Sequence, residues 1–548
     1  MRNHMRFMLG SFLFLVSLSM LGLTACAPQA AGGAFADDID QVLAQSGIES
    51  AVMDDAARVP AVSQLTSTTV FTGAIDGANY EIKVPDSWDG GTLLVYAHGI
   101  RDKADHPGQE DNTTAYASPS SEVEAELLAQ GYALAGSAYR DNGWAVQEGI
   151  SDTVALTEFF SSTVGAPSKT LLVGVSMGTL VSLKAIERYP HLYDGVMAAC
   201  GPLAGSSMTW DGAGAVALAY DVAFGWQEDW GTPGDVRDDI YFGRLVGGVL
   251  PEGDVLPALA PLTLDFENQF PKAEFVRLIA GLTNEQNSFY QTVDGQNGLW
   301  VLVIMNAITE TRAELERRAG GAVSQNLNHV YDLSAADKVY LSGLGVDADA
   351  WLAEMNARTV YSATAEARSY LASYADLTGD INYPVLTMHT MYDGFVADNH
   401  ESVYRDLVAD AGKSDLLVQT YVDSIGHCTF TTEQIIQAIT ALDAWTATGA
   451  APAVTDFTAS GFVQDYTPDP WPVTFTDSPT DPATAPVTDP VTDPVTDPVT
   501  DPATDPVTDP TTDPATDPVT DPAQPSEPAA DEGVMDAITA IYLPFIAR

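Results

Sequence analysis

The chain of 548 residues is 46% hydrophobic, which is ordinary for a globular core, and it is long enough for two or three average domains. Its 75 acidic and 23 basic residues give a formal net charge of −52, most of which lies ahead of the repetitive tail that begins near 480. A negative charge of this size argues against nucleic acid and anionic lipid surfaces as partners.

The N-terminus has the pattern of an export signal over 1–26. Arg2 and Arg6 precede an apolar run over 7–21, which is too short to span a bilayer comfortably. The next residues, Leu23-Thr24-Ala25-Cys26, resemble the bacterial lipobox, in which the cysteine is acylated and becomes the mature N-terminus. This resemblance predicts a lipid anchor on Cys26 that holds the protein at the membrane surface of the cell envelope. An ordinary secretory signal is the alternative, and both predict export to a place where disulfides persist.

Strand-like and helical segments then alternate, which predicts an α/β domain over about 60–449. A short leading helix is expected over 37–57. The expected strands are 66–73, 80–84, 92–97, 132–138, 171–173, 194–200, 383–389 and 416–422, and the main helices are 120–130, 145–163 and 431–446.

Around the middle strand, Gly174-Val175-Ser176-Met177-Gly178 predicts a sharp turn from a buried strand into a helix. The pattern resembles the nucleophile elbow of the α/β-hydrolase fold, in which such a turn lifts a serine hydroxyl above the sheet. Five residues alone are weak evidence, but here a strand precedes the turn and a helix follows it. The fold expected from this resemblance is a doubly wound, mostly parallel sheet.

Two loops before the elbow carry further expected site residues. His98-Gly99 follows the third strand, as in lipases and esterases, and this resemblance implies an oxyanion hole made by the N–H groups of Ile100 and Met177. His98 itself is expected to be structural. Tyr139 and Trp144 follow the next strand on the ligand-facing edge, where they would line a substrate pocket or simply pack under a loop.

Between about 201 and 379 the alternation of strands and helices stops, and helical periodicities take its place. Helices are expected over 214–226, 236–249, 273–281, 299–319, 348–356 and 364–374. An insertion of this kind resembles the cap that α/β hydrolases carry over the active site, and a separate helical domain is the alternative.

The remaining members of a catalytic triad follow in the order of the α/β-hydrolase fold. Asp393 lies in a loop three residues before a valine, and His427 follows the last expected strand. The histidine is needed to accept the proton of Ser176, and the aspartate to orient the imidazole. Asp423 and Asp398 are rival acids, and Asp393 is ranked first.

The segment from Gly426 to Phe430 resembles the ending of secreted bacterial esterases of the tannase and feruloyl esterase kind. In those proteins a cysteine directly before the serine bonds one directly after the histidine, whereas here Val175 precedes Ser176. The departure puts tannase-type specificity in doubt. Because Cys26 belongs to the export signal, Cys200 and Cys428 remain as one pair, and we predict a disulfide between them with two free thiols as the alternative.

Past the α/β domain, 450–479 is expected to be a linker. A Thr-Asp-Pro-x repeat over 480–523 predicts a disordered, extended spacer, because proline at every fourth residue forbids helix and sheet. The C-terminal tail is expected over 524–548, and its last segment, 533–548, is too short to cross a membrane and is expected to be a sorting tag or an inert end.

The function expected from the resemblance is a secreted serine hydrolase that cleaves carboxylic esters, with no cofactor and no metal. Neutral, largely apolar or aromatic small-molecule esters are the expected substrates, because the acidic body would repel anions. A peptidase of the prolyl-oligopeptidase or proline-iminopeptidase kind is one alternative, with Glu310, Glu314 and Glu316 as acids that could hold a substrate amine, although a solvated charged face is expected there. The other alternative is a surface-displayed binding module on a hydrolase scaffold.

Overall fold

The computed structural model describes residues 67–246, 250–259, 266–282 and 304–471. The export signal with Cys26, the leading helix over 37–57, the repeat and the C-terminal tail lie outside the described residues. None of the helices in these four ranges is both long and apolar enough to cross a membrane.

A nine-stranded sheet runs through the described part of the chain, with the strand order β1-β2-β4-β3-β5-β6-β11-β12-β13. The six strands from β4 to β12 in this order are parallel to one another, while β1, β2 and β13 pair antiparallel with their neighbours. Their bounds are β1 Thr68–Ile75, β2 Ala78–Pro85, β3 Thr92–Ala97, β4 Ala133–Ser137, β5 Lys169–Val175, β6 Gly195–Ala199, β11 Val385–Tyr392, β12 Leu417–Ile425 and β13 Phe462–Val463.

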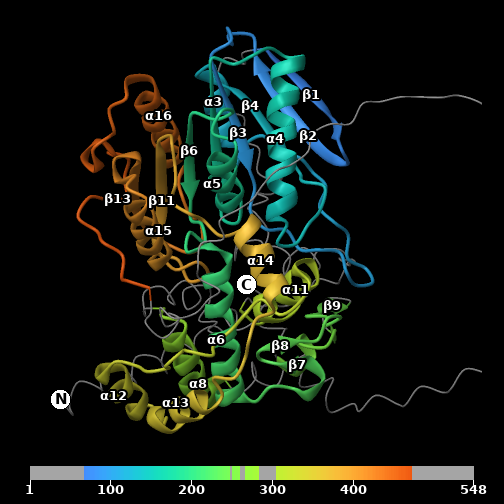
Figure 1. Ribbon diagram of the computed structural model, residues 1–548, viewed down its shortest axis with the longest axis vertical. Coiled ribbons are helices and arrows are strands. Elements are labelled where there is room, and N and C mark those ends of the chain that lie inside the picture. Colours follow the sequence, from blue (N-terminus) through green and yellow to red (C-terminus); the bar gives the residue numbers. More distant parts are fainter. Residues whose placement is uncertain (1–66, 247–249, 260–265, 283–303, 472–548) are drawn as a thin grey trace, which may run out of the picture.

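Helices cover both faces of the sheet (Figure 1), as the run of apolar residues in each central strand requires. Successive side chains of a strand point to opposite faces, so Leu93 and Val95 join one core cluster and Leu94 joins another. The first cluster contains residues of α4 (Val146–Thr163), α5 (Gly178–Arg188) and α15 (Asn399–Asp410). The second contains residues of α3 (Ser121–Ala129) and α16 (Thr432–Thr448). The expected doubly wound, mostly parallel fold is therefore confirmed.

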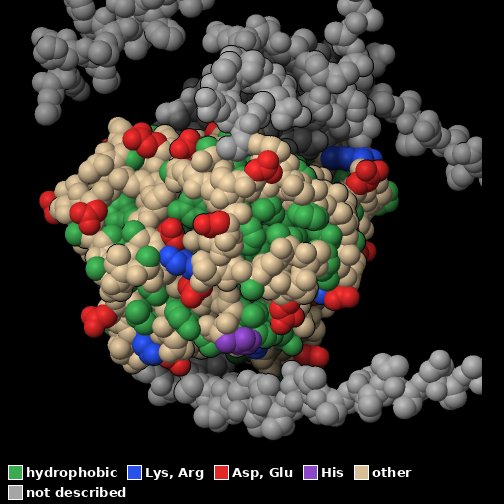
Figure 2. Space-filling model, turned by 90° about the horizontal axis from the view of Figure 1, so that it is seen from above, with side chains coloured by type: hydrophobic (Ala, Val, Ile, Leu, Met, Phe, Trp, Pro, Cys, Tyr) green, Lys and Arg blue, Asp and Glu red, His purple; other side chains and the backbone are tan. Residues whose placement is uncertain are grey.

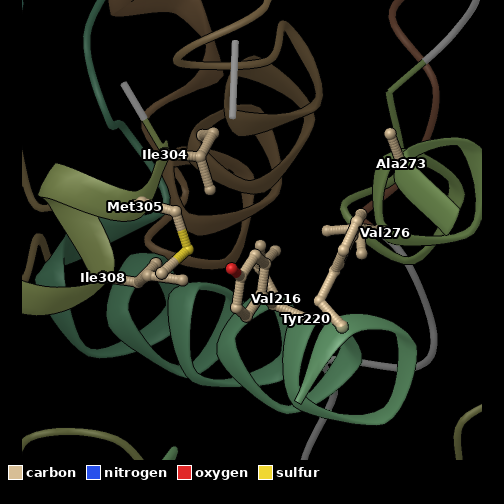
Figure 3. A pocket seen from close by; sticks show the side chains of 8 residues that line it. Val216, Tyr220, Ala273, Val276, Ile304, Met305 and Ile308 are labelled. Atoms are coloured by element: carbon tan, nitrogen blue, oxygen red, sulfur yellow. The ribbon is translucent and has the colours of Figure 1, made fainter. Parts of the chain in front are cut away.

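The predicted insertion between β6 and β11 is largely helical and gathers at one end of the sheet (Figure 1). Its helices in the described ranges are α6 Gly205–Phe224, α8 Phe266–Ile279, α11 Arg312–Ala319, α12 Ala335–Gly343, α13 Ala348–Ala357 and α14 Ala365–Tyr374, and a π-helical turn, Ala307–Thr311, precedes α11. Two further apolar clusters form its core. A small apolar cavity between α6, α8 and the π-helical turn has room for about one water molecule (Figure 3).

The helix predicted over 236–249 is wrong for the part that the structure describes. The chain instead forms short strands, β7 Gly231–Thr232, β8 Asp235–Val236, β9 Arg244–Val246 and β10 Leu250–Glu252. The N–H groups of Tyr241 and Phe242 donate to the carboxylates of Asp254 and Glu310, and not to a preceding turn of helix. Gly243 has φ +116°, a backbone conformation that an α-helix does not contain.

The predicted linker is also wrong over 450–471, which packs against the α/β domain. β13 adds to the sheet beside β12, and Phe457 is buried against α16 and its neighbours. Further along, the Tyr466 hydroxyl donates to Asp398, and the Ser402 hydroxyl donates to the carbonyl of Asp469 at 2.9 Å. The packed body therefore continues about twenty residues past the predicted boundary at 449.

Candidate active site

Ser176 lies at the turn from β5 into α5, as its sequence pattern predicts. Its φ of +52° is in the left-handed region, which few residues other than glycine adopt. The turn is held by the Ser176 N–H, which donates to Ala199 O of β6 at 2.9 Å, and by the Thr179 N–H and hydroxyl, which both donate to Ser176 O. This strained conformation is of the kind that clusters at functional sites.

The two glycines of the pattern are required by close packing around that turn. A Cβ on Gly178 would lie 2.0 Å from Ala97 O at the end of β3. A Cβ on Gly174 would lie 2.5 Å from Gly178 O and 2.6 Å from the Ser182 hydroxyl. Any side chain at either position would push the helix off the sheet and displace Ser176.

The structure brings Ser176, His427 and Asp393 together in one hydrogen-bonded chain. His427 Nε2 lies 2.9 Å from Ser176 Oγ, and His427 Nδ1 lies 2.7 Å from Asp393 Oδ2. All three are buried: Ser176 is 6% exposed, His427 7% and Asp393 0%. With Nδ1–H donating to the carboxylate, Nε2 is left as the acceptor for the serine proton.

Asp393 is held as an ionised acceptor. Its Oδ1 accepts the N–H groups of Phe395 and Val396, both at 2.9 Å. Burial alone would raise the pKa of the Asp393 carboxyl, but the charge and hydrogen bond of His427, the charge of His389 and the Phe395 N–H together hold it below its usual range.

The two rival acids lie elsewhere. Asp398 precedes α15 and accepts the Tyr466 hydroxyl, while Asp423 is an exposed residue of β12. Of the three acids, the one that contacts His427 is Asp393, the acid ranked first from the sequence.

The loop after β3 approaches Ser176 closely. A Cβ on Gly99 would lie 3.1 Å from Ser176 Cβ, so the backbone here passes directly beside the serine. Met177 is the N-cap residue directly before α5, so its N–H has no acceptor within the helix. This placement suits the predicted oxyanion hole, and the roles of the Ile100 and Met177 N–H groups stay a prediction.

His98 is buried and structural in character. It stacks on the Tyr139 ring with centroids 3.9 Å apart, and its Nδ1 lies 2.6 Å from Gly99 O. Burial, together with the charge of Arg101, lowers the pKa of His98 to about 3, so the ring is neutral.

Tyr139 and Trp144 are buried in the core cluster between the sheet and the cap. The Tyr139 hydroxyl donates to His98 O at 3.3 Å, and the Trp144 indole N–H donates to the Ser206 hydroxyl of α6 at 2.8 Å. Packing accounts for both side chains. The substrate contact predicted for them is not needed to explain their positions, and it stays a prediction.

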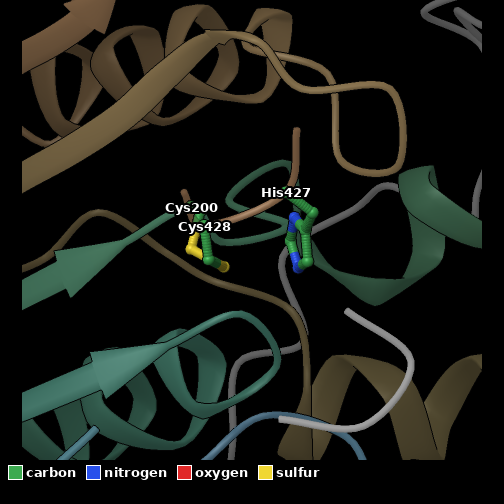
Figure 4. A group of neighbouring side chains, drawn as sticks. All are labelled: Cys200, His427 and Cys428. Carbon is green, nitrogen blue, oxygen red and sulfur yellow. A yellow bond between two sulfur atoms is a disulfide. The ribbon is translucent and has the colours of Figure 1, made fainter. Parts of the chain in front are cut away.

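The predicted disulfide between Cys200 and Cys428 is present, with 5.4 Å between the two Cα atoms (Figure 4). Cys200 follows β6 directly, and the preceding Ala199 pairs with Val175, the neighbour of Ser176. The bond therefore reaches the His427 loop from the strand next to the elbow. Although both sulfurs and the imidazole lie close together, the bonded sulfurs offer no thiolate to a metal.

Glu314 and Glu316 are buried and ion-paired, and the half-buried Glu310 is hydrogen-bonded, so the expected solvated face is wrong. Glu316 pairs with the fully buried Arg312, and Glu314 pairs with Arg318. Glu314 also accepts the Trp144 N–H at 2.8 Å, and Glu310 accepts Gln109 and the Phe242 N–H. These contacts join the cap to the loops after β3 and β4. Because the carboxylates are already satisfied, none is left to hold a substrate amine.

Sequence reasoning missed two buried residues behind Asp393. His389, on β11, has its Nε2 3.7 Å from Asp393 Oδ2, and Glu401 of α15 lies on the other side of its ring. A histidine four residues before the acid was the available signal, but nothing in the pattern showed that it faces the same carboxylate.

The strand order, the turn at Ser176 and the Ser–His–Asp chain together have the arrangement of the α/β-hydrolase fold. No family model matches the sequence.

Individual proteins are nevertheless similar. The o-phthalyl amidase of Xanthobacter agilis is 23% identical over 425 residues, which are 70% of this chain and 88% of that protein. Lipase A of Candida antarctica is 12% identical (TM-score 0.32; 70% of this chain, 76% of that one). Feruloyl esterase B of Aspergillus oryzae is also 12% identical (TM-score 0.34; 73% and 85%). A proposed dipeptidyl aminopeptidase IV of Bacteroides ovatus is 10% identical (TM-score 0.34), and the match covers 70% of this chain but only 36% of that one.

Proposed function

We propose that this protein hydrolyses carboxylic esters through an acyl-enzyme on Ser176. The observation that carries the proposal is the hydrogen-bonded chain from Ser176 Oγ through His427 to Asp393, at 2.9 and 2.7 Å, set on a strained strand-to-helix turn. A serine hydroxyl is too weakly acidic to attack a carbonyl unaided, so it needs a base at this distance.

In the first half-reaction His427 Nε2 takes the proton of Ser176 as Oγ attacks the ester carbonyl carbon. The tetrahedral oxyanion is stabilised by the N–H groups of Met177 and Ile100. His427 then returns the proton to the leaving alkoxide, which departs as an alcohol. In the second half-reaction water attacks the acyl group with the same base, and Ser176 is regenerated with release of the acid. Asp393 holds the imidazole tautomer and stabilises the imidazolium throughout.

Amide hydrolysis is the second candidate. It is favoured by the name of the Xanthobacter agilis relative, an amidase, and the same residues perform it with an amine as leaving group. The peptidase alternative shares this chemistry, but the satisfied cap glutamates remove the observation that motivated it.

A matched ester and amide of one aromatic acid separate these candidates. We expect the ester to have the higher kcat/KM by at least about tenfold, because a tetrahedral intermediate expels an alkoxide more readily than an amine. Initial rates at saturating and limiting substrate, with an anilide included, give the comparison. Turnover of the amide or anilide faster than the ester would move the proposal to amide hydrolysis.

We further propose that neutral apolar or aromatic esters are preferred over anionic ones. The support is the excess of acidic side chains, which is visible on the face of the described body shown in Figure 2, where few basic side chains accompany them. The basic residues nearest the site loops are already engaged: Arg101 is buried beside Tyr116, and Arg140 pairs with Asp152.

Two esters that differ only in a distal carboxylate test this preference. The neutral ester should have the higher kcat/KM at low salt, and the difference should shrink as salt screens the field over a Debye length of about 10 Å at 0.1 M. A higher kcat/KM for the anionic ester at low salt would contradict the electrostatic argument and would indicate a local cationic subsite.

Location at the cell envelope is part of the proposal and rests on the sequence of 1–26 alone. With Cys26 acylated, the hydrolase would be held at the membrane surface by lipid, with the Thr-Asp-Pro repeat as a spacer at the other end. A surface-displayed binding module would be expected to have the same lipid anchor and the same repeat. This alternative is disfavoured by the aligned hydrogen bonds of Ser176, His427 and Asp393, which a binding protein does not need.

A further inference from the structure

A fully buried ion cluster lies directly behind the Asp393 carboxylate. His389 of β11 and Glu401 of α15 are both 0% exposed. His389 Nε2 lies 3.7 Å from Asp393 Oδ2, the oxygen that also contacts His427, and 2.9 Å from Val396 O. On the opposite side of the ring, Nδ1 lies 3.4 Å from Glu401 Oε1.

Both ring nitrogens of His389 therefore face oxygens. Val396 O is a carbonyl and only accepts, so Nε2 must carry a proton. Glu401 Oε2 accepts the Thr387 hydroxyl at 2.6 Å and the Gln419 amide N–H, and Glu401 Oε1 is the oxygen that faces Nδ1. Two donors on Oε2 stabilise the charged carboxylate, so Oε1 accepts from Nδ1, which makes His389 an imidazolium and Glu401 its carboxylate partner.

The balance of charges agrees with this assignment. Burial would lower the pKa of His389, but the hydrogen bond and charge of Glu401, followed by the charge of Asp393 and the Val396 carbonyl, outweigh it and raise the pKa to about 9. His400 is also buried nearby on α15, but its Nδ1 accepts the Ala204 N–H, and burial with the charge of His389 lowers its pKa to about 3. His400 is therefore neutral.

We propose that His389, held as an imidazolium by Glu401, is a positioning residue that fixes the Asp393 loop and places a positive charge behind the carboxylate that orients His427. The proposal rests on the triad function proposed above. Through Val396 O it fixes the same turn whose N–H groups hold Asp393 Oδ1. Its positive charge lies beside Asp393 Oδ2, the same oxygen that contacts His427.

The other ionisable groups around His389 do not cancel its charge at Asp393. Glu401 lies on the far side of the ring from Asp393, so its opposing field at His427 is weaker. Asp398 contributes a further acid whose pKa is raised by burial, and it accepts the hydroxyl of Tyr466 from the 450–471 segment. Tyr421 of β12 is a phenol whose pKa is raised by burial, so it adds no charge near neutral pH.

The test is the pH dependence of ester hydrolysis in His389→Gln. His389 is separated from His427 by Asp393 alone. Removing its positive charge should raise the midpoint of the acidic limb in the pH profile of kcat/KM by roughly one pH unit. It should lower kcat more than it changes KM, since the residue touches no substrate. The single variant leaves the buried Glu401 carboxylate without its partner and could fail to fold, whereas the double variant His389→Gln/Glu401→Gln leaves no unpaired charge there. In the double variant the midpoint of the acidic limb should also rise, by a smaller amount.

His400→Gln is the matched control, because it removes a buried but neutral imidazole from the same region, and its acidic limb should stay at the wild-type pH. If His389→Gln has a lower kcat but an unchanged midpoint of the acidic limb, His389 acts only by packing and the proposal is overturned. A midpoint that shifts to lower pH would also overturn the electrostatic role. Either result would leave the function of Ser176 intact.

A second measurement does not depend on catalysis. A folded-state pKa raised to about 9 stabilises the protein fully below the unfolded value of about 6.5, and the contribution is lost as pH rises to 9. The advantage of the wild type over His389→Gln in denaturant midpoint should therefore narrow between pH 6.5 and 9. A constant difference over that range would show that His389 carries no charge and would overturn the proposal even if no substrate were known.

Discussion

Replacing Ser176 with alanine should lower kcat for ester hydrolysis by roughly 10⁴- to 10⁶-fold while leaving the protein folded. The variant loses the nucleophile, and His427 then has no hydroxyl to activate at 2.9 Å. Folding should survive because the turn is held by backbone groups, from the Ser176 N–H to Ala199 O and from the Thr179 N–H to Ser176 O. Substrate binding should change little, since most contacts with the acyl group remain.

A fluorophosphonate probe gives the same answer without a known substrate. Wild-type protein should form one covalent adduct, located by peptide mass mapping at Ser176, and the alanine variant should form none. Ser182→Ala is a suitable control, because that buried serine of α5 donates its hydroxyl to Gly178 O and should not be needed for labelling. Undiminished hydrolysis by pure Ser176→Ala would refute the proposed function, and an unlabelled wild type would favour the binding module.

Removing the disulfide with Cys200→Ser and Cys428→Ser should lower the free energy of unfolding by roughly 4–5 kcal/mol. The bond closes a loop of 228 residues that contains the whole cap, and the entropy that such a link removes from the unfolded chain grows with loop length. Both cysteines also have positive φ, +51° and +56°, so the bond holds backbone that would relax without it.

The activity of this variant should fall together with its stability, because Cys428 is the residue next to His427. Denaturant unfolding and kcat can be measured in parallel on the double variant and on wild type treated with a reductant. The double variant and the reduced wild type should have the same denaturant midpoint and kcat, because both proteins lack the disulfide. The variant differs only in that it also lacks the two thiols. Reduced wild type that unfolds at the oxidised midpoint would contradict the stabilising role.

Much of the site was predictable because its parts are local patterns. The elbow needs two glycines within five residues, and the steric reason is visible in the 2.0 Å approach of a Gly178 Cβ to Ala97 O. The order of Ser176, Asp393 and His427 follows from the order of the strands that bear them. Cys200 and Cys428 could be paired by elimination, since both were expected at the same end of the sheet.

The features that were missed depend on contacts between distant residues. The segment predicted to be a helix over 236–249 is pinned instead by carboxylates of Asp254 and Glu310, which no local window contains. Glu316 has the spacing of an exposed helix face, yet its pairing with Arg312 lets both be buried. His389 gains its charge only because α15 brings Glu401 to it. The segment 450–471 is polar enough to suggest a linker, but it docks through a few aromatic side chains such as Phe457.

The cap begins and ends at neighbouring points of the structure. The Ser206 N–H at the start of α6 donates to Ala375 O just past α14 at 3.0 Å, and the Ser207 hydroxyl donates to Asp376 at 2.6 Å. The second end is also tied to α5, because Lys184 donates to Asp376 O at 2.7 Å. A tight turn could therefore close the gap that remains if the insertion is removed, with every strand of the sheet kept in place. The geometry therefore allows the cap to be exchanged as one segment without moving the strands that carry Ser176, Asp393 and His427.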